Sequence, residues 1–253
     1  MAPAAIENEG FALVPGILSE IERRSLFTTV GAMTHAGQRG VLANPEVARV
    51  ACSARLLALV APHTSAEPRP VRAIYFNKSS AANWSVTWHQ DVTVAVRQRM
   101  DVDGFGPWSI KDGVAHTQAP AEVLKHMLTI RLHLDDCDES NGALRVLPGT
   151  HAFGRLSPEQ IARLRAQISE IVCCARAGDA LLMRPLLLHA SAKSQGTGLR
   201  RILHIEYAGG QLPDGLQWND PPYRGSVFDA QLEKQKGAVN GDCAKQKANT
   251  VTE

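Results

Sequence analysis

The stretch WSVTWHQDVTVAV, residues 84–96, surrounds a histidine and an aspartate with β-branched and aromatic residues. This density of Val, Thr and Trp is typical of a β-strand. Residues i and i+2 of a strand point to the same face, so His89 and Asp91 are predicted to point together and Gln90 away from them. Their Cα atoms would lie roughly 6–7 Å apart. That separation suits two neighbouring ligands of one metal ion.

From about residue 70 the chain consists of short β-rich runs separated by turn residues, and helical patterns come before them. The predicted strands include VRAIYF, MLTIRLHL, ALRVL, EIVCC, DALLMRPLLLH and RRILHIEYA. Strands that follow helices without alternating with them argue against a parallel α/β fold. The sequence therefore predicts a mainly β protein, a double-sheet barrel with flanking α-helices.

Three helices are predicted from their start signals. SEIERRSLFTTV begins with Ser19 and has Glu22 three residues later, which is a capping box. NPEVARVACSARLLALV has Asn44 as its cap and Pro45 at its first position, and it is predicted as one helix that stops before Pro62. SPEQIARLRAQI is a further capped helix within the strand region.

Two connecting segments carry distinct signals. Asn-Gly in ESNGAL, between two β-rich runs, predicts a tight turn. Residues 102–120, VDGFGPWSIKDGVAHTQAP, are rich in Gly and are predicted to be a long loop. Loops of this length are uncommon unless functional, so we expect a lid that closes over a substrate.

Composition limits the class of protein. The 253 residues are 44% apolar and 21% charged with a net charge of +2, so charge gives no reason to expect nucleic acid or a membrane surface as partner. We read no signal peptide in MAPAAIENEG and no spanning apolar run. Five cysteines, an odd number, are a poor disulfide framework, and a cytoplasmic location is expected. We predict a single domain over residues 1–230 and a polar C-terminal tail over 231–253; the sequence does not indicate the oligomeric state.

A His-x-Asp pair is weak by itself, because a polar pair on a solvent-facing strand gives the same pattern. One imidazole and one carboxylate are two of the three ligands in the 2-His-1-carboxylate triad of non-haem Fe(II) oxygenases. His189 is the best candidate for the third ligand, since the apolar run LLMRPLLLH ends on it. Ser191 follows two residues later and Arg200 eleven later. An Arg-Ser pair is a good receptor for a carboxylate.

The ordered set WHQD (88–91), NGALRVLPGTH (141–151) and HASAKSQGTGLRR (189–201) resembles the phytanoyl-CoA dioxygenase family of Fe(II)/2-oxoglutarate oxygenases. The resemblance runs from about residue 9 to about residue 210. It implies a double-stranded β-helix, that is, a cupin-like jelly roll. It implies Fe(II) bound by His89, Asp91 and His189, and 2-oxoglutarate as cosubstrate with its distal carboxylate on Arg200 and Ser191.

The resemblance also implies a reaction. A small-molecule substrate would react with O2 while 2-oxoglutarate is converted to succinate and CO2, and hydroxylation is the usual outcome. Asp91 occupies the position that related halogenases leave open for chloride, so we expect oxygenation and not halogenation. We expect the substrate to be a small or medium polar metabolite.

Two cosubstrate contacts are implied less directly. Lys78 matches a polar position on the strand before His89, and Arg131 stands where the family often has a tryptophan. In MLTIRLHL, Thr129, Arg131 and His133 share one face, which the sequence leaves open as solvent-facing or inward. Strand parity allows only one of Arg200 and the neighbouring Arg201 to face inward, and the spacing from His189 favours Arg200. His204 would share that face as a packed histidine.

Two alternatives remain open at this stage. A cupin-like metalloenzyme could use the same three ligands without 2-oxoglutarate, but it gives no role to Arg200 and Ser191. A non-catalytic jelly-roll binding protein could keep the fold without the chemistry, but it does not explain why all three metal ligands are retained.

Overall fold

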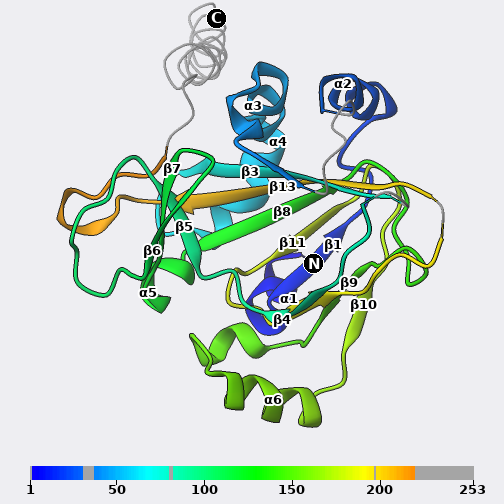
Figure 1. The fold of residues 1–253 in the computed structure, drawn as a ribbon. Coiled ribbons are helices and arrows are strands. Elements are labelled where there is room, and N and C mark those ends of the chain that lie inside the picture. The colour runs from blue at the N-terminus through cyan, green and yellow to red at the C-terminus, as the bar shows by residue number, and fades with distance from the viewer. Residues whose placement is uncertain (1, 31–36, 80–81, 197, 220–253) are drawn as a thin grey trace, which may run out of the picture.

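The computed structural model describes residues 2–30, 37–79, 82–196 and 198–219. Two antiparallel sheets face each other, and a smaller third sheet lies at one end (Figure 1). The major sheet has six strands in the order β1-β11-β8-β13-β3-β2, and the minor sheet has four in the order β10-β9-β12-β4. The third sheet is β5-β7-β6. The expected mainly β jelly roll with flanking helices is confirmed.

The structure defines the bounds of each element as follows. The strands are β1 Phe11–Val14, β2 Gly37–Arg39, β3 Pro68–Lys78, β4 Val86–His89, β5 Thr93–Val96, β6 Trp108–Lys111, β7 Val114–Gln118, β8 Met127–His133, β9 Leu144–Val146, β10 Ile171–Cys173, β11 Ala180–Met183, β12 His189–Ser191 and β13 Arg200–Gly209. The α-helices are α1 Ala2–Glu9, α2 Glu20–Val30, α3 Pro45–Ala51, α4 Ala54–Val60, α5 Ala121–Leu124 and α6 Pro158–Gln167. Short 3₁₀ turns are η1 Val41–Ala43, η2 Ala61–His63, η3 Thr150–Phe153 and η4 Pro213–Gly215.

The major sheet is buried on both faces at its central strand, β8. Its outer face is apolar and packs under α2, α3 and α4, which lie along one side of the sheet (Figure 1). The alternate residues Leu128, Ile130 and Leu132 of β8 join Leu203 and Ile205 of β13 in one cluster with the helices. The inner face points toward the minor sheet and carries the polar residues of these strands.

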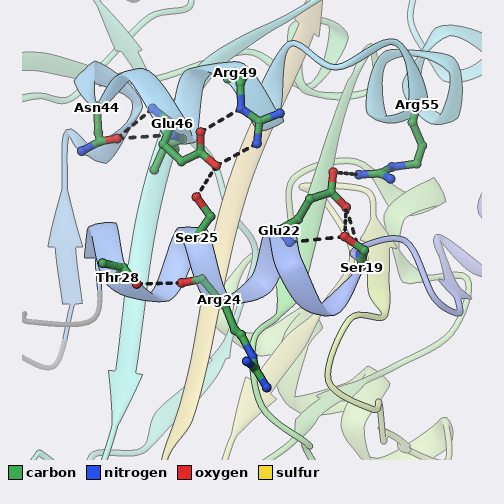
Figure 2. Close-up of polar contacts among 10 residues, drawn as sticks. Ser19, Glu22, Arg24, Ser25, Thr28, Asn44, Glu46, Arg49 and Arg55 are labelled. Carbon is green, nitrogen blue, oxygen red and sulfur yellow. Dashed lines mark hydrogen bonds and ion pairs between the residues drawn. The ribbon is translucent and has the colours of Figure 1, made fainter.

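Helix caps and ion pairs hold the helical layer together (Figure 2). The Ser19 hydroxyl accepts from the Glu22 N–H while the Glu22 carboxylate accepts from the Ser19 N–H, so the capping box is confirmed. Arg55 of α4 donates to the Glu22 carboxylate at 2.8 Å. Ser25 of α2 donates to Glu46 of α3 at 2.8 Å. These contacts tie α2 to both helices that follow it.

The prediction of a single helix from Asn44 to the residue before Pro62 is wrong, because this segment forms two helices, α3 and α4. Asn44 caps α3 as expected, with its side chain accepting from two backbone N–H groups. The break lies at Cys52 and Ser53, where Ser53 has extended backbone dihedrals and becomes the cap residue of α4. A serine in this conformation suits a helix start better than a helix interior.

The prediction of a long loop over residues 102–120 is also wrong. β6 and β7 form a hairpin within this segment, with Trp108 paired to Thr117, and β7 pairs in turn with β5. The hairpin turns at Asp112 and Gly113, whose φ angles of 50° and 78° are those that Asp-Gly supplies in a two-residue turn. The lid hypothesis therefore loses its basis, since residues 108–118 form a hairpin that pairs with β5 and not a long irregular loop.

Two long β-rich runs are each interrupted. The run 84–96 divides into β4 and β5 around residues 90–92, and the run 179–189 divides into β11 and β12 around Pro185, which has no N–H for a ladder. Neither α1 nor β1 was predicted from the sequence; β1 completes the major sheet by pairing with β11. The expected C-terminal tail, 231–253, lies outside the described residues.

Candidate metal centre

His89 and His189 lie side by side on two neighbouring strands of the minor sheet. β4 and β12 are antiparallel neighbours, and their register pairs His89 directly with His189. The two imidazole centroids lie 4.1 Å apart. Asp91 Oδ1 lies 3.7 Å from His89 Nε2, and Asp91 Oδ2 lies 3.5 Å from His189 Nε2. One ligand atom from each residue lies within 4.8 Å of the others, so the three groups could hold a single metal ion.

Backbone carbonyls fix the tautomers of both histidines. His89 Nδ1 lies 2.8 Å from the carbonyl oxygen of Thr87, and His189 Nδ1 lies 2.8 Å from that of Leu187. A carbonyl can only accept, so each Nδ1 carries a proton, and Nε2 is the ring nitrogen available to a metal. Burial lowers the pKa of His189 to about 4, which keeps this ring neutral and able to bind a metal near pH 7.

Asp91 lies just beyond the end of β4, so simple strand parity does not explain why it turns toward His89. Its N–H donates to the Pro185 carbonyl at 2.8 Å. The Gln90 amide group points the other way, donating to the carbonyls of Gly154 and Leu186 and accepting from the Leu156 N–H. Gln90 thus anchors the chain on one side and leaves Asp91 on the metal side.

The environment of Asp91 favours a charged carboxylate. Burial opposes the charge, but the surrounding His189, His204, His89 and Arg72 lower the pKa of Asp91 well below its usual range. Its Oδ2 is buried and has no hydrogen-bond partner among the described residues. A buried, ionised and unpartnered oxygen beside two Nε2 lone pairs fits a divalent cation.

Arg200 and Lys78 lie side by side on the inner face of the major sheet. β13 and β3 pair Arg200 with Lys78, and both side chains are buried. Arg200 Nη1 donates to the Gly142 carbonyl at 2.7 Å, and Lys78 donates to that of Ala192. Burial lowers the pKa of Lys78 to about 8, and the nearby Arg200 charge adds to this effect.

The Asn-Gly turn places Gly142 against these two cations. Gly142 has a φ of 80°, and a Cβ there would meet the Ala192 oxygen at 2.5 Å and Lys78 Nζ at 3.1 Å. Ser191 is buried on β12, two residues beyond His189. The predicted cosubstrate residues Arg200, Lys78 and Ser191 therefore belong to elements that converge at one end of the barrel interior.

Arg131 faces inward, which settles the orientation of the polar face of β8. Thr129, Arg131 and His133 are all buried on the side away from the helices. Arg131 donates to His204 Nδ1 at 3.0 Å. Because arginine can only donate, His204 carries its proton on Nε2, which lies 3.3 Å from the Glu206 carboxylate. His204 is thus a packed histidine within a polar chain, as expected.

Arg201 points away from the interior. Its guanidinium pairs with the carboxylate of Asp135, donating through Nε at 2.6 Å, and it stacks over the Phe27 ring with 4.1 Å to the centroid. Arg200 is therefore the arginine on the inner face. Its Nε and the Nε of Arg131 are both buried without a hydrogen-bond partner among the described residues. Buried cations with unused donors fit a polycarboxylate ligand such as 2-oxoglutarate.

The charged residues at the other end of this inner face were not predicted from the sequence. Arg72 of β3 pairs with Glu206 of β13, and their side chains are 12% and 3% exposed. Strand parity places Arg72 on the same face as Lys78, and Glu206 on the same face as Arg200. Only the register of β3 and β13 shows that Arg72 and Glu206 are paired. Phe76 was missed as well; its ring packs edge-on against His204, with centroids 5.7 Å apart.

Residues 7–202 match the sequence model of the phytanoyl-CoA dioxygenase (PhyH) family. This match covers well over half of the chain. The protein belongs to the phytanoyl-CoA dioxygenase family. It is therefore an Fe(II)- and 2-oxoglutarate-dependent oxygenase, which acts on a small molecule with O2. A search of curated proteins finds no match.

Solved structures of similar fold include several 2-oxoglutarate-binding proteins. EctD from S. alaskensis, solved with 2-oxoglutarate and 5-hydroxyectoine, has a TM-score of 0.63 at 19% identity, over 81% of this chain and 74% of that chain. SnoN, a non-haem α-ketoglutarate-dependent epimerase from nogalamycin biosynthesis, has a TM-score of 0.63 at 17% identity, over 89% and 95%. HygX from Streptomyces hygroscopicus, solved with nickel and 2-oxoglutarate, has a TM-score of 0.58 at 17% identity, over 82% and 86%. At these identities the likeness shows the fold.

Proposed function

We propose that this enzyme hydroxylates a small or medium polar metabolite, with His89, Asp91 and His189 as the iron ligands. The observation that carries the proposal is the convergence of these three groups, with both Nε2 lone pairs and one carboxylate oxygen free of other strong partners. Bound iron would supply the redox chemistry that couples O2 and 2-oxoglutarate to substrate oxidation.

The chain's own residues account for cosubstrate binding. Arg200 and Lys78 would hold the distal carboxylate of 2-oxoglutarate with Ser191, and Arg131 would contribute a positive charge closer to the metal. The pKa of Arg131 is lowered to about 10, by burial first and then by Arg200. Unneutralised cations raise each other's cost of burial, so a bound dianion would stabilise this end of the barrel.

The tautomers support the metal assignment independently. The Thr87 and Leu187 carbonyls hold the two Nδ1 protons, so the rings cannot turn their Nε2 atoms away without losing a hydrogen bond. Gln90 holds the backbone that presents Asp91. These contacts orient the three ligands before any metal binds.

The remaining features support a cytoplasmic enzyme of small molecules. The four described cysteines are free, and the net charge of +2 offers no strong attraction for nucleic acid or a lipid surface. None of the described helices is long and apolar enough to cross a membrane. We take residues 1–230 to be one catalytic domain.

Anaerobic spectroscopy tests the proposal. The purified protein is mixed with Fe(II) and 2-oxoglutarate, and a weak visible charge-transfer band is expected. The band should be absent in His89→Ala. In Arg200→Ala, a higher concentration of 2-oxoglutarate should be needed to reach the same band intensity. Iron binding without a band in the wild type would contradict the 2-oxoglutarate assignment, and failure to bind iron would contradict the metal site.

A further inference from the structure

The inner face of the major sheet carries two separate groups of charge. Arg200 and Lys78 lie at one end, and Arg72 lies at the other, six residues before Lys78 on β3. Glu206, opposite Arg72, closes the polar chain that begins at Arg131 and passes through His204. The Arg72 end is too far along the strand to share the distal carboxylate held at Arg200, since six residues of strand span roughly 20 Å.

The hairpin β6–β7 brings a second cation to the Arg72 end. Its turn residue Asp112 pairs with Arg39 of β2 at 3.6 Å, and the register of β2 sets Arg39 beside Ile74 of β3. Lys111 precedes Asp112, so it lies near the part of β3 that carries Arg72. Among the described residues Lys111 makes no ion pair at 4.0 Å or closer.

The face of the hairpin sheet that bears Lys111 also carries Ser109 and His116. Register pairs Ser109 with His116 and Lys111 with Val114, so these four residues share one face. The opposite face carries Val94, Val96 and Ala115, which belong to the apolar cluster beneath. Lys111 is partly buried, and the opposite face of its sheet packs into the core. The backbone that carries Lys111 is therefore held in place by core packing.

The charge of Arg72 acts on both Asp91 and Lys111. Its charge helps to lower the pKa of Asp91, and it is the main charged neighbour that lowers the pKa of Lys111 after burial itself. Arg72 Nη2 donates to Glu206, while its Nε is buried with no hydrogen-bond partner among the described residues. His116 adds no charge, because burial lowers its pKa and its Nδ1 donates to the Val114 carbonyl.

The carboxylates at this end are already engaged. Glu206 is shared by Arg72 and His204, and Asp112 pairs with Arg39. Asp91 belongs to the candidate metal centre, so Lys111 is left without a carboxylate of its own among the described residues. A bound anion would supply the missing partner and use the free Arg72 donor. We propose that the substrate carries a carboxylate, which Arg72 and Lys111 bind on the side of the metal centre away from Arg200. This inference rests on the proposed function, since it names the substrate class of that site.

The test uses propionate and its uncharged isostere propionamide as probes. The protein is labelled with 15N-histidine and loaded with Zn(II), which is diamagnetic, and with saturating 2-oxoglutarate, which fills the Arg200 end. Propionate, at constant ionic strength, should shift the His116 resonances in a saturable way below 100 mM, and propionamide should not. His116→Gln assigns the signal.

Matched variants locate the effect. Lys111→Gln and Arg72→Gln should each weaken propionate binding about tenfold, the loss expected for one charge-assisted hydrogen bond. Lys125→Gln, which removes an exposed lysine paired with Glu122 on α5, should change nothing. If Arg72→Gln fails to fold because Glu206 loses its partner, Arg72→Lys and Lys111→Gln still provide the comparison.

The outcomes separate the two proposals. Equal responses to propionate and propionamide, or no saturable response to propionate, overturn the inference about the substrate. Unchanged propionate affinity in Lys111→Gln, or in Arg72→Gln where it folds, contradicts the assignment of these two residues as the carboxylate-binding site. The visible band of a parallel anaerobic Fe(II) sample reports on the proposed function alone, so its absence would contradict that function whatever propionate does.

Discussion

Side chains along β8 alternate between two environments that are both closed to solvent. Leu128, Ile130 and Leu132 pack under the helices, while Thr129 and Arg131 face the barrel interior, on the side of the candidate metal centre. Apolar contacts stabilise the buried outer face. On the inner face, burial costs free energy that only specific partners or a ligand offset. The comparison teaches that low exposure alone does not distinguish core from site in this fold.

Loss of an inner-face group that lacks a strong partner in the protein should therefore reduce function more than stability. His89→Ala removes a metal ligand, and we expect succinate release to fall at least about a hundredfold, because loss even of groups that support a ligand commonly costs 10–100-fold. Iron content and thermal unfolding of the same samples are the measurements. Full activity with bound iron would contradict the metal assignment.

The outer face should behave in the opposite way. Ile130→Ala leaves a cavity between β8 and the helices, and the free energy of unfolding should fall by about 2–5 kcal/mol. Urea unfolding measures this change. The charge-transfer band per folded molecule should stay unchanged. A weakened band at full folding would show that the outer face reaches the site.

Neighbouring arginines on β13 provide a matched pair across the sheet. Arg200→Gln should raise the KM for 2-oxoglutarate about 10–100-fold, since it removes charge-assisted hydrogen bonds from a buried site. Arg201→Gln loses the mostly buried ion pair with Asp135 on the other face and should cost about 1–3 kcal/mol of stability, without change in KM. Equal KM values in the two variants would contradict the inner-face assignment of the cosubstrate.

Much of this division was predictable from local pattern. The candidate metal ligands stood out because His-x-Asp within a β-rich run and a histidine at the end of an apolar run are both unusual. The spacing from His189 favoured Arg200 over Arg201 as the inward-facing arginine. The hairpin at 112–113 was missed although Asp-Gly signals it, because the Gly-rich composition of 102–120 was given more weight. The pairing of Arg72 with Glu206 depends on strands 134 residues apart, so only the register of β3 and β13 reveals it.

Parity could not decide the direction of Arg131 for a physical reason. A strand with one polar face looks the same whether that face meets water or a second sheet that carries a site. What decides is the minor sheet, whose strand β12 brings His189 opposite β8 and β13. The same ambiguity applies to Arg72. Whether its side chain meets water or the barrel interior becomes clear only when the positions of both sheets are known.

The smallest expected effect concerns the charge of Lys78. Its pKa of about 8 lies below the usual 10.5 because burial, aided by Arg200, disfavours the ammonium form. The ammonium is present below about pH 8, so 2-oxoglutarate affinity should be full there and KM should rise about tenfold from pH 7 to pH 9. Steady-state succinate release across this range is the measurement.

Lys78→Arg is the matched control, because arginine keeps its charge over the whole range and its KM should stay flat. Stability of the protein without ligand should move in the opposite direction to affinity. The cost of burying the ammonium is present in full below about pH 8 and is relieved between pH 8 and 10.5, so this group's contribution to the free energy of unfolding should increase as pH rises. If affinity and stability instead rose together above about pH 8, Lys78 would not be the group that titrates, and the inner face would owe its pH dependence to another residue.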